Sequence, residues 1–240
     1  WPMLGCRYAF TSYVLANPYY IGIFHFQTML RFDTYFWQAF RNTLVLSIVK
    51  LILNTGAAVI ISLLLNEITN MAFKKSVQTI IYLPHFMSWV VVAAVFKMIL
   101  SVNSSGVVNG ALINMGLIDN PIDFLGSSKY WTGTFFMMNV WKDTGWGTIL
   151  FLATLSGISP DLYEAAQIDG ANRFKRLIYI TLPALANTII TVFILNLAKV
   201  MNLFESVFVT QSAGTYDVSQ VLQTYVYNKT FSASFSDYGY

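Results

Sequence analysis

Long apolar stretches separated by short polar segments dominate the chain. Four of them reach the length of about 20 residues that an α-helix needs to cross the hydrocarbon of a bilayer. They occupy residues 42–65, 77–100, 130–157 and 184–208. No segment shows the alternation of a membrane β-strand, and only helices then satisfy the backbone inside lipid. The pattern therefore predicts an all-α membrane protein, with a kink at Pro84 inside the second stretch.

Basic residues gather in two of the connecting segments. Lys74 and Lys75 follow the first stretch, and Arg173, Lys175 and Arg176 follow the third. Loops on the cytoplasmic side of a membrane carry an excess of Lys and Arg, so both segments are predicted to be cytoplasmic. The segment 101–129 and the tail from Gln211 onward, which are rich in small polar residues, are predicted to lie outside.

The composition agrees with a membrane protein and excludes other classes. Of the 240 residues, 56% are hydrophobic and 10% are charged, and the mean hydropathy is +0.57, which lies outside the range of soluble domains. The net charge of +3 is dispersed and gives no basic face for nucleic acid. A single cysteine, Cys6, and two separate histidines predict neither a disulfide framework nor a metal site. No phosphate-binding loop or nucleophile motif occurs, so no catalytic residue is predicted.

The whole chain, 1–240, is predicted to be one membrane domain, because neither a linker nor a repeat of fixed period divides it. A cytoplasmic loop at 159–183 belongs to this domain. The first ten residues resemble the outer end of an earlier helix, and the last three are rich in the interfacial aromatics that often open a new span. We therefore expect one helix before Trp1 and another after Tyr240.

The loop between the third and fourth stretches carries the signals of a helix, a break and a second helix. Ser159 suits an N-cap and Pro160 the first helical position. Gly170 is placed to end this helix, and a second helix is predicted from Ala171, with Pro183 marking the turn into the next stretch. By periodicity alone, the pair is either a docking element or an interfacial link between two spans that lies along the membrane surface.

The same loop resembles the EAA loop of ABC importer permeases in residue type and spacing. The matching segments are Glu164-Ala165-Ala166, the sugar-type Asp169-Gly170-Ala171, and Leu182-Pro183. In that family the loop is a coupling helix that docks in a groove on a cytoplasmic ATPase subunit. The resemblance implies an ATPase interface made of Glu164, Ala165, Ala166, Asp169, Gly170 and Ala171. The carboxylate of Glu164 can pair with an arginine of the partner, while the two alanines that follow permit close approach.

Four further segments resemble the polysaccharide and lipo-oligosaccharide permeases within the sugar group. They are 82–90, 106–109, 121–125 and 221–227. The resemblance covers nearly the whole chain and implies a multi-pass permease subunit, in the bacterial inner membrane, of an ATP-driven, binding-protein-dependent importer of oligo- or polysaccharides. The implied fold is the six-helix core of a type I ABC importer permease, of which this chain would carry helices two to five.

The resemblance also implies partners. These are a second, related permease that completes a pseudo-symmetric heterodimer, two cytoplasmic ATPase subunits, and an extracytoplasmic solute-binding protein. ATP and Mg²⁺ would bind to the ATPase subunits, so we expect no cofactor and no enzymatic activity on this chain. An importer of another solute and an ion-coupled secondary transporter are the alternatives. The residues Asp169-Gly170-Ala171 argue against the first, and the loop from Glu164 to Pro183 argues against the second.

Polar residues that recur at helical spacing inside two stretches mark a candidate sugar path. They are Asn139, Lys142 and Trp146 in the third stretch, and Asn196, Lys199 and Asn202 in the fourth. A hydrated cavity would offer these amides and ammonium groups to hydroxyls or carboxylates and the Trp146 ring to a sugar face, and a basic lining would favour acidic saccharides. The alternative is that Lys142 and Asp143, and Lys199 and Glu205, bond one another or neighbouring helices inside the bundle.

His85 follows Pro84 in an apolar stretch. We expect its ring to bond a backbone carbonyl that the kink frees. A proton relay is the alternative, because ionisable groups inside a membrane are functional candidates.

Overall fold

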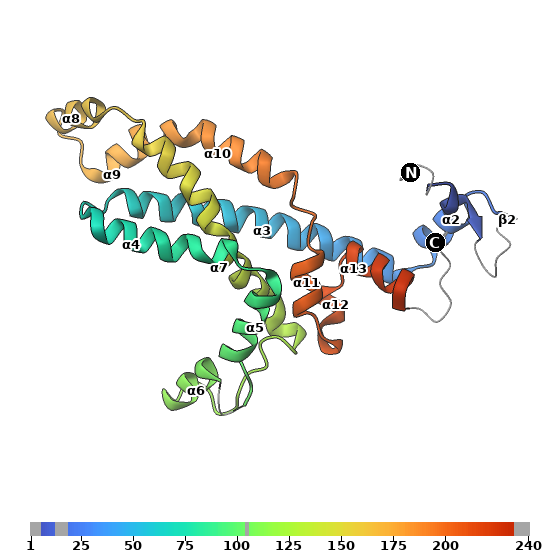
Figure 1. The fold of residues 1–240 in the computed structure, drawn as a ribbon. Helices are drawn as coiled ribbons and strands as arrows, with labels where there is room; N and C mark the ends of the chain where they lie inside the picture. The colour runs from blue at the N-terminus through green and yellow to red at the C-terminus, as the bar shows by residue number, and fades with distance from the viewer. Residues whose placement is uncertain (1–5, 13–18, 104–105, 233–240) are drawn as a thin grey trace.

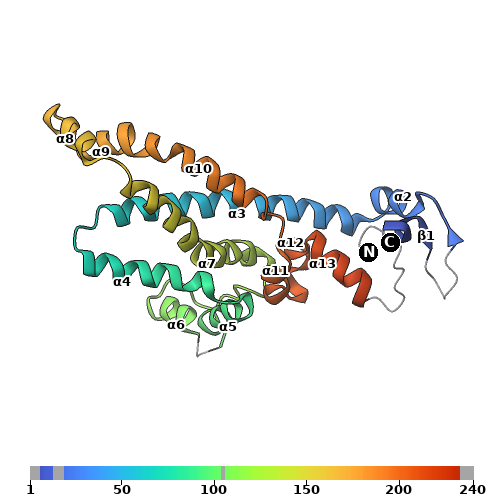
Figure 2. The same ribbon diagram turned by 45° about the horizontal axis from the view of Figure 1, so that its top comes forward.

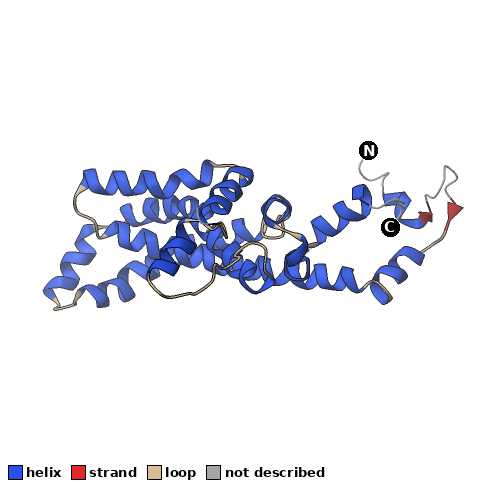
Figure 3. Ribbon diagram, turned by 90° about the horizontal axis from the view of Figure 1, so that it is seen from below, coloured by secondary structure: helices blue, strands red, loops and turns tan. Residues whose placement is uncertain are grey.

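The chain folds almost entirely into helices. The computed structural model describes residues 6–12, 19–103 and 106–232. Within them, two short strands, β1 (Thr11–Ser12) and β2 (Tyr19–Tyr20), form one antiparallel pair (Figure 3). The all-α prediction is thus confirmed, while the helices expected before Trp1 and after Tyr240 lie outside the described residues.

Four helices lie side by side in an elongated bundle (Figures 1 and 2). They are α3 (Thr34–Asn66), α4 (Met71–Tyr82), α7 (Ser128–Ser156) and α10 (Leu182–Leu197). The longest, α3, begins where the Asp33 side chain accepts hydrogen bonds from two backbone N–H groups, well before the predicted start at residue 42. Its 33 residues extend about 50 Å at the helical rise. It therefore forms the spine of the molecule.

The second predicted stretch is bent sharply rather than kinked. After α4, the 3-10 turn η2 (Leu83–Phe86) leads into α5 (Trp89–Ile99), and the two halves differ in direction by 109°. Pro84 fits the first turn of η2, where its missing N–H costs nothing. Ser88 Oγ accepts a hydrogen bond from the backbone of Val91 at 3.3 Å and caps α5. The prediction of a bend near Pro84 is confirmed.

The fourth predicted stretch is broken, so a continuous helix over 184–208 is wrong. The helix begins earlier, as α9 (Arg173–Arg176) and the π-helical η3 (Leu177–Thr181), and α10 ends at Leu197. A turn precedes α11 (Phe204–Thr210), and the Gln223 side chain accepts hydrogen bonds from the backbone of Leu203 and Phe204 at 2.9 and 2.7 Å. These contacts satisfy donors that the break frees.

Pro183 does not mark a turn, because η3 leads directly into α10. A proline ring clashes with the carbonyl four residues earlier in an ordinary α-helix, and the wider π turn avoids this clash. The second helix of the loop is therefore not a separate surface helix. It is the first part of the membrane helix that ends at Leu197.

Short helices occupy the remaining described segments. They are η1 (Cys6–Phe10), α2 (Phe24–Arg31), α6 (Val107–Asn114), α8 (Pro160–Ile168), η4 (Ala213–Thr215), α12 (Tyr216–Ser219), α13 (Leu222–Tyr227) and η5 (Asn228–Ser232). The segment from α11 to α13 packs on α3 and α7. Trp131 donates a hydrogen bond to the carbonyl of Thr210 at 3.1 Å, and Asn42 donates to the carbonyls of Asp217 and Gln220 at 2.9 and 3.1 Å. This contact closes the end of the bundle opposite α8 (Figure 1).

Two continuous helices in the described part of the chain are long and apolar enough to cross a membrane. They are α3 and the helix Arg173–Leu197, and the bent pair of α4 and α5 gives a third. The 29 residues of α7 are long enough, but Lys142 and Asp143 lie in the middle of this helix. Its crossing, and hence the fourth span, stays a prediction.

The two basic segments lie at the same end of the bundle. The connection between α3 and α4 and the helix α8 are neighbours in Figures 1 and 2. Arg173 Nη1 lies 4.0 Å from Glu67 Oε2 across this end. The charge pattern requires both basic segments to lie on the same side of the membrane, and the structure agrees. That this side is cytoplasmic stays a prediction.

Candidate functional site

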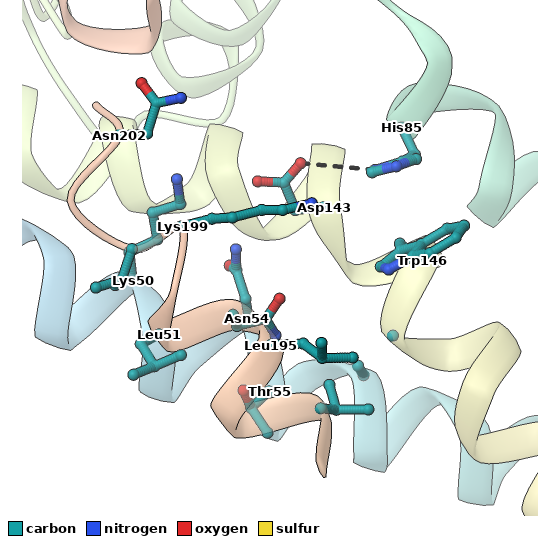
Figure 4. A pocket seen from close by; sticks show the side chains of 15 residues that line it. Lys50, Leu51, Asn54, Thr55, His85, Asp143, Trp146, Leu195, Lys199 and Asn202 are labelled. Atoms are coloured by element: carbon teal, nitrogen blue, oxygen red, sulfur yellow. Dashed lines mark ion pairs between the residues drawn. The ribbon is translucent and has the colours of Figure 1, made fainter. Parts of the chain in front are cut away.

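A cavity of about 620 Å³ opens between α3, α7, α10 and η2 (Figure 4). Its volume lies within the range of small-molecule sites, about 300–1,000 Å³. Apolar side chains line part of it. The polar, charged and aromatic side chains that line it are Lys50, Asn54, Thr55, His85, Asp143, Trp146, Asn196, Lys199 and Asn202.

Two rings form a flat surface on one wall of the cavity. The His85 and Trp146 rings stack with their centroids 5.5 Å apart and their planes 17° apart. His85 Nδ1 lies 3.8 Å from Asp143 Oδ1, the pair that the dashed line in Figure 4 marks. Trp146 is 49% exposed, so its ring is available to a ligand. Such a surface can pack against the apolar face of a sugar ring.

Amides and lysines supply the hydrogen-bonding groups of the cavity. Lys50 extends from α3, and Lys199 comes from the turn after α10. Among the described lining residues, Asp143 is the one carboxylate, and its Oδ1 lies 3.8 Å from His85 Nδ1. The lining can therefore bond hydroxyl groups through amides and carboxylates through two ammonium groups.

Breaks in two helices place three of these side chains. His85 belongs to η2, and Lys199 and Asn202 belong to the turn between α10 and α11. Irregular backbone at membrane depth is tolerated where it lines a cavity or is buried in protein. The bend and the break are therefore parts of the cavity wall rather than defects of the bundle.

The structure brings together four of the six residues predicted for the sugar path. Trp146, Asn196, Lys199 and Asn202 line the cavity, whereas Asn139 and Lys142 do not. Asn139 is fully buried and donates a hydrogen bond to the carbonyl of Phe135 at 2.7 Å. Of the three residues predicted on α7, Trp146 alone lines the cavity, because α5 folds back over the N-terminal half of α7, where Val92 and Ala93 pack on Met138.

Lys142 binds the bend rather than the cavity. Its Nζ donates a hydrogen bond to the carbonyl of His85 at 3.0 Å and lies 5.7 Å from the centre of the Trp89 ring. The expectation that the His85 ring bonds a freed carbonyl is wrong, because the freed carbonyl is that of His85 and its donor is Lys142. The ring itself faces the cavity.

The two predicted lysine pairs do not form. Lys142 donates to a carbonyl, and the carboxylate next to it, Asp143, lies near His85 instead. Among the described residues, no ion pair joins Lys199 to Glu205, and Lys199 lines the cavity. The structural alternative therefore fits Lys142, which bonds the neighbouring segment η2 rather than Asp143, whereas Lys199 lines the cavity.

The sequence-based interpretation missed Lys50, Asn54 and Asp143 as lining residues. Lys50 is a lone charge inside the first apolar stretch, and Asn54 follows four residues later on the same helical face. That spacing is the signal that would have identified this wall of the cavity.

A second candidate site is the exposed helix α8. Ser159 Oγ accepts a hydrogen bond from the backbone of Asp161, and Gly170 ends the helix with φ of +76°. The predicted start and break are confirmed. The next helix begins at Arg173 rather than Ala171, because Asn172 caps it by accepting a hydrogen bond from the backbone of Lys175 at 2.9 Å.

The predicted interface residues lie on the surface of α8 and the turn after it. Glu164, Ala165, Asp169 and Gly170 are exposed, and Ala166 and Ala171 are half-buried. Two apolar side chains of α8 are also exposed, Leu162 at 55% and Ile168 at 88%. A short helix with exposed carboxylates and apolar groups is suited to docking in a groove of a partner.

Residues 54–235 match the family described as binding-protein-dependent transport system inner membrane component. The chain belongs to this family. It is 38% identical over 234 residues to protein LplB of Bacillus subtilis (strain 168), and 35% identical over 231 residues to the polygalacturonan/rhamnogalacturonan transport system permease protein YteP of the same organism. Each alignment covers 94% of this chain and 71% of the relative.

Solved structures are similar over the whole chain. A chain in the crystal structure of a bacterial ABC transporter involved in the import of the acidic polysaccharide alginate has a TM-score of 0.88 and 34% sequence identity, with 99% of this chain and 80% of that chain covered. A chain in the crystal structure of a bacterial alginate ABC transporter in complex with an alginate pentasaccharide-bound periplasmic protein has a TM-score of 0.87 and 34% sequence identity.

The comparisons establish the class of protein. The chain is a permease subunit with the type I ABC importer fold, in the inner membrane of a bacterium, and members of its family are not themselves enzymes. The expected fold and family are confirmed. An ion-coupled secondary transporter is excluded as an alternative.

Proposed function

We propose that this chain forms half of the translocation pathway of an ATP-driven importer of oligo- or polysaccharides, and that ATP is hydrolysed on separate cytoplasmic subunits. The observation that carries the proposal is one continuous helix, Arg173–Leu197, which begins beside the exposed α8 and ends at the polar cavity. A helix that connects a docking surface to a cavity can convert movement at one into a change of shape at the other.

The substrate class that fits the cavity best is an acidic saccharide. The described lining contains two lysines, Lys50 and Lys199, and one carboxylate, that of Asp143. The His85 ring already lies beside this carboxylate. Amides of Asn54 and Asn196 can bond hydroxyl groups. The names of relatives support the same class, because one transports polygalacturonan and rhamnogalacturonan and a similar structure belongs to an importer of the acidic polysaccharide alginate.

The proposed assembly contains a second, related permease, two ATPase subunits and an extracytoplasmic solute-binding protein. Exposed apolar side chains on α10, such as Ile190 and Ile194 at 58% each, leave surface for lipid or for the second permease. ATP and Mg²⁺ would bind to the ATPase subunits alone, since this chain has no phosphate-binding loop. The solute-binding protein would deliver the saccharide at the end opposite α8.

A charge reversal on α8 tests the docking role. Glu164→Lys places a like charge opposite an arginine of the ATPase groove, and such a contact is strongly unfavourable. We expect binding-protein-stimulated ATP hydrolysis by the purified complex to fall at least about tenfold, with the permease still inserted in the membrane.

Asp119→Lys is the matched control, because Asp119 is an exposed carboxylate far from α8 in the sequence. It is expected to keep the wild-type rate of ATP hydrolysis measured without the binding protein, because Asp119 lies on the side predicted to face that protein and not the ATPase subunits. Equal rates in Glu164→Lys and the wild type would refute docking through α8.

A further inference from the structure

A hydrogen bond between two side chains joins α8 to the helix that leads to the cavity. Tyr163 Oη lies 3.0 Å from Thr181 Oγ1. Thr181 is 5% exposed and Tyr163 is half-buried, so water competes little for this contact. In the described part of the chain, it is the one side-chain hydrogen bond between α8 and a membrane helix.

Thr181 lies where its helix is least regular. It is the last residue of the π-helical turn Leu177–Thr181, and Pro183 follows two residues later. Thr181 Oγ1 also lies 3.4 Å from the carbonyl of Arg176. π-Helical turns are rare and occur frequently at functional sites. Because Thr181 is the last residue of this turn, its hydrogen bond to Tyr163 joins α8 directly to the start of α10.

Beyond this turn the helix is regular and reaches the cavity. The 16 residues of α10 extend about 24 Å. Leu195 and Asn196, near its end, line the cavity. A hydrogen bond of 2.8 Å between the hydroxyl groups of Thr154 and Thr188 holds α10 against α7. A displacement at Thr181 is thus carried along a stiff element to the substrate-facing end.

Other contacts near α8, at the same end of the bundle, do not have this geometry. Ile158, just before the helix, packs on the core around Leu155 and Leu185, and anchors the end of α7 rather than α10 alone. Arg173 and Glu67 are 4.0 Å apart, with side chains 87% and 68% exposed. An exposed pair of this kind contributes little.

We propose that Tyr163 is a positioning residue that transmits movement of α8 into α10 through its hydrogen bond to Thr181. This inference rests on the proposed function, because α8 moves only if an ATPase subunit binds it. The pair then determines how much of each cycle of ATP hydrolysis becomes opening or closing of the cavity. Without this hydrogen bond, movement of α8 deforms the π turn Leu177–Thr181 and does not displace α10.

The test measures saccharide uptake and ATP hydrolysis in the same vesicles, which contain the complete transporter and an acidic oligosaccharide carried by its binding protein. Tyr163→Phe and Thr181→Val each remove one hydroxyl group. Each is expected to lower the uptake per ATP hydrolysed by about two- to tenfold, the range for the loss of one hydrogen bond. The double variant should be no worse than the poorer single variant, because both remove the same contact.

Two controls distinguish transmission from a structural role. Thr181→Ser retains the hydroxyl group and should restore the uptake per ATP, and Tyr179→Phe removes a hydroxyl group that is on an exposed side chain of the same turn, 76% accessible, and should change nothing. An unchanged ratio in both Tyr163→Phe and Thr181→Val overturns the proposal. Failure of both variants to assemble also overturns it, since the pair would then be structural.

Failure of the proposed function gives a different result. In that case the wild-type complex shows no ATP-dependent uptake, or Glu164→Lys leaves ATP hydrolysis unchanged. Neither outcome depends on the hydroxyl groups of Tyr163 and Thr181.

Discussion

Two lysines in the predicted membrane stretches have different roles because their surroundings differ. Lys142 is buried at 7% exposure and donates to the carbonyl of His85, where a helical segment ends at the bend. A positive charge is stabilised at such an end by the helix dipole. Lys199 lies in a turn that lines the cavity. The first lysine therefore supports the fold, and the second is available to a substrate.

Substitutions at these positions should separate the two roles. Lys199→Met and Trp146→Ala should slow saccharide uptake while leaving the amount of assembled complex nearly unchanged. Lys142→Met leaves the buried carbonyl of His85 without its donor, which costs about 1–3 kcal/mol. It should lower the thermal stability of the purified complex, measured by the temperature of its unfolding transition.

A stable Lys142→Met variant with slow uptake would contradict this assignment and return Lys142 to the sugar path. Normal uptake in both Lys199→Met and Trp146→Ala would remove the cavity from the path.

The sequence alone could place Trp146 on a polar face of α7, but it could not tell which residues of that face line the cavity. Lys142 and Trp146 are one helical turn apart, so periodicity groups them. The bend of 109° after η2 decides which of them α5 covers. A bend angle depends on tertiary packing, and no local pattern specifies it.

At the scale of the element, glycines on α7 allow helices to approach closely. A Cβ atom at position 145 would lie 2.5 Å from the carbonyl oxygen of Ile81 and 3.0 Å from Tyr82 Cα, both backbone atoms. A Cβ at position 147 would lie 2.8 Å from that of Ala58 on α3. Small residues at helix contacts are how membrane helices pack tightly. Gly145 and Gly147 thus set the spacing of α4, α7 and α3.

Gly145→Ala should therefore destabilise the permease. The α4 backbone must shift to admit the methyl group, and overpacking of this kind costs about 1–3 kcal/mol. Gly133→Ala, on the same helix, is the matched control, because a Cβ there would have no atom within 4 Å, and alanine stabilises a helix by about 0.5–1 kcal/mol relative to glycine. Denaturant titration of both variants measures the difference in their free energies of unfolding. Equal values would contradict the prediction, because the α4 backbone would then shift at no cost.

The start and the end of α8 were predictable from the sequence, whereas the break in the fourth stretch was not. The caps of α8 at Ser159 and its end at Gly170 follow from residue type, since a hydroxyl group caps and a glycine adopts positive φ. The break at 198–203 contains neither proline nor glycine and continues the apolar pattern. It is stabilised by Gln223, which is distant in sequence and accepts two backbone hydrogen bonds there.

At the scale of the whole molecule, the proposed ATPase-binding end and the cavity belong to one connected structure. The exposed α8 lies at one end of the bundle, and the short helices from α11 to α13 close the other (Figure 1). The helix Arg173–Leu197 connects α8 with the cavity walls. Fold and family were predictable from the sequence, because apolar length and the loop motif are local signals. The position of the cavity between two broken helices was not.

The central claim is that ATP drives an acidic saccharide through this chain, and one measurement tests it most directly. Vesicles that contain the purified transporter are loaded with ATP on the side of α8, and uptake of a uronic-acid oligosaccharide is recorded with its binding protein, with and without vanadate. The account predicts uptake that requires ATP, stops with vanadate, and exceeds that of a neutral oligosaccharide of the same length by about tenfold, as for one charge-assisted contact. Uptake that an ion gradient drives without ATP, and that vanadate leaves unchanged, would contradict it.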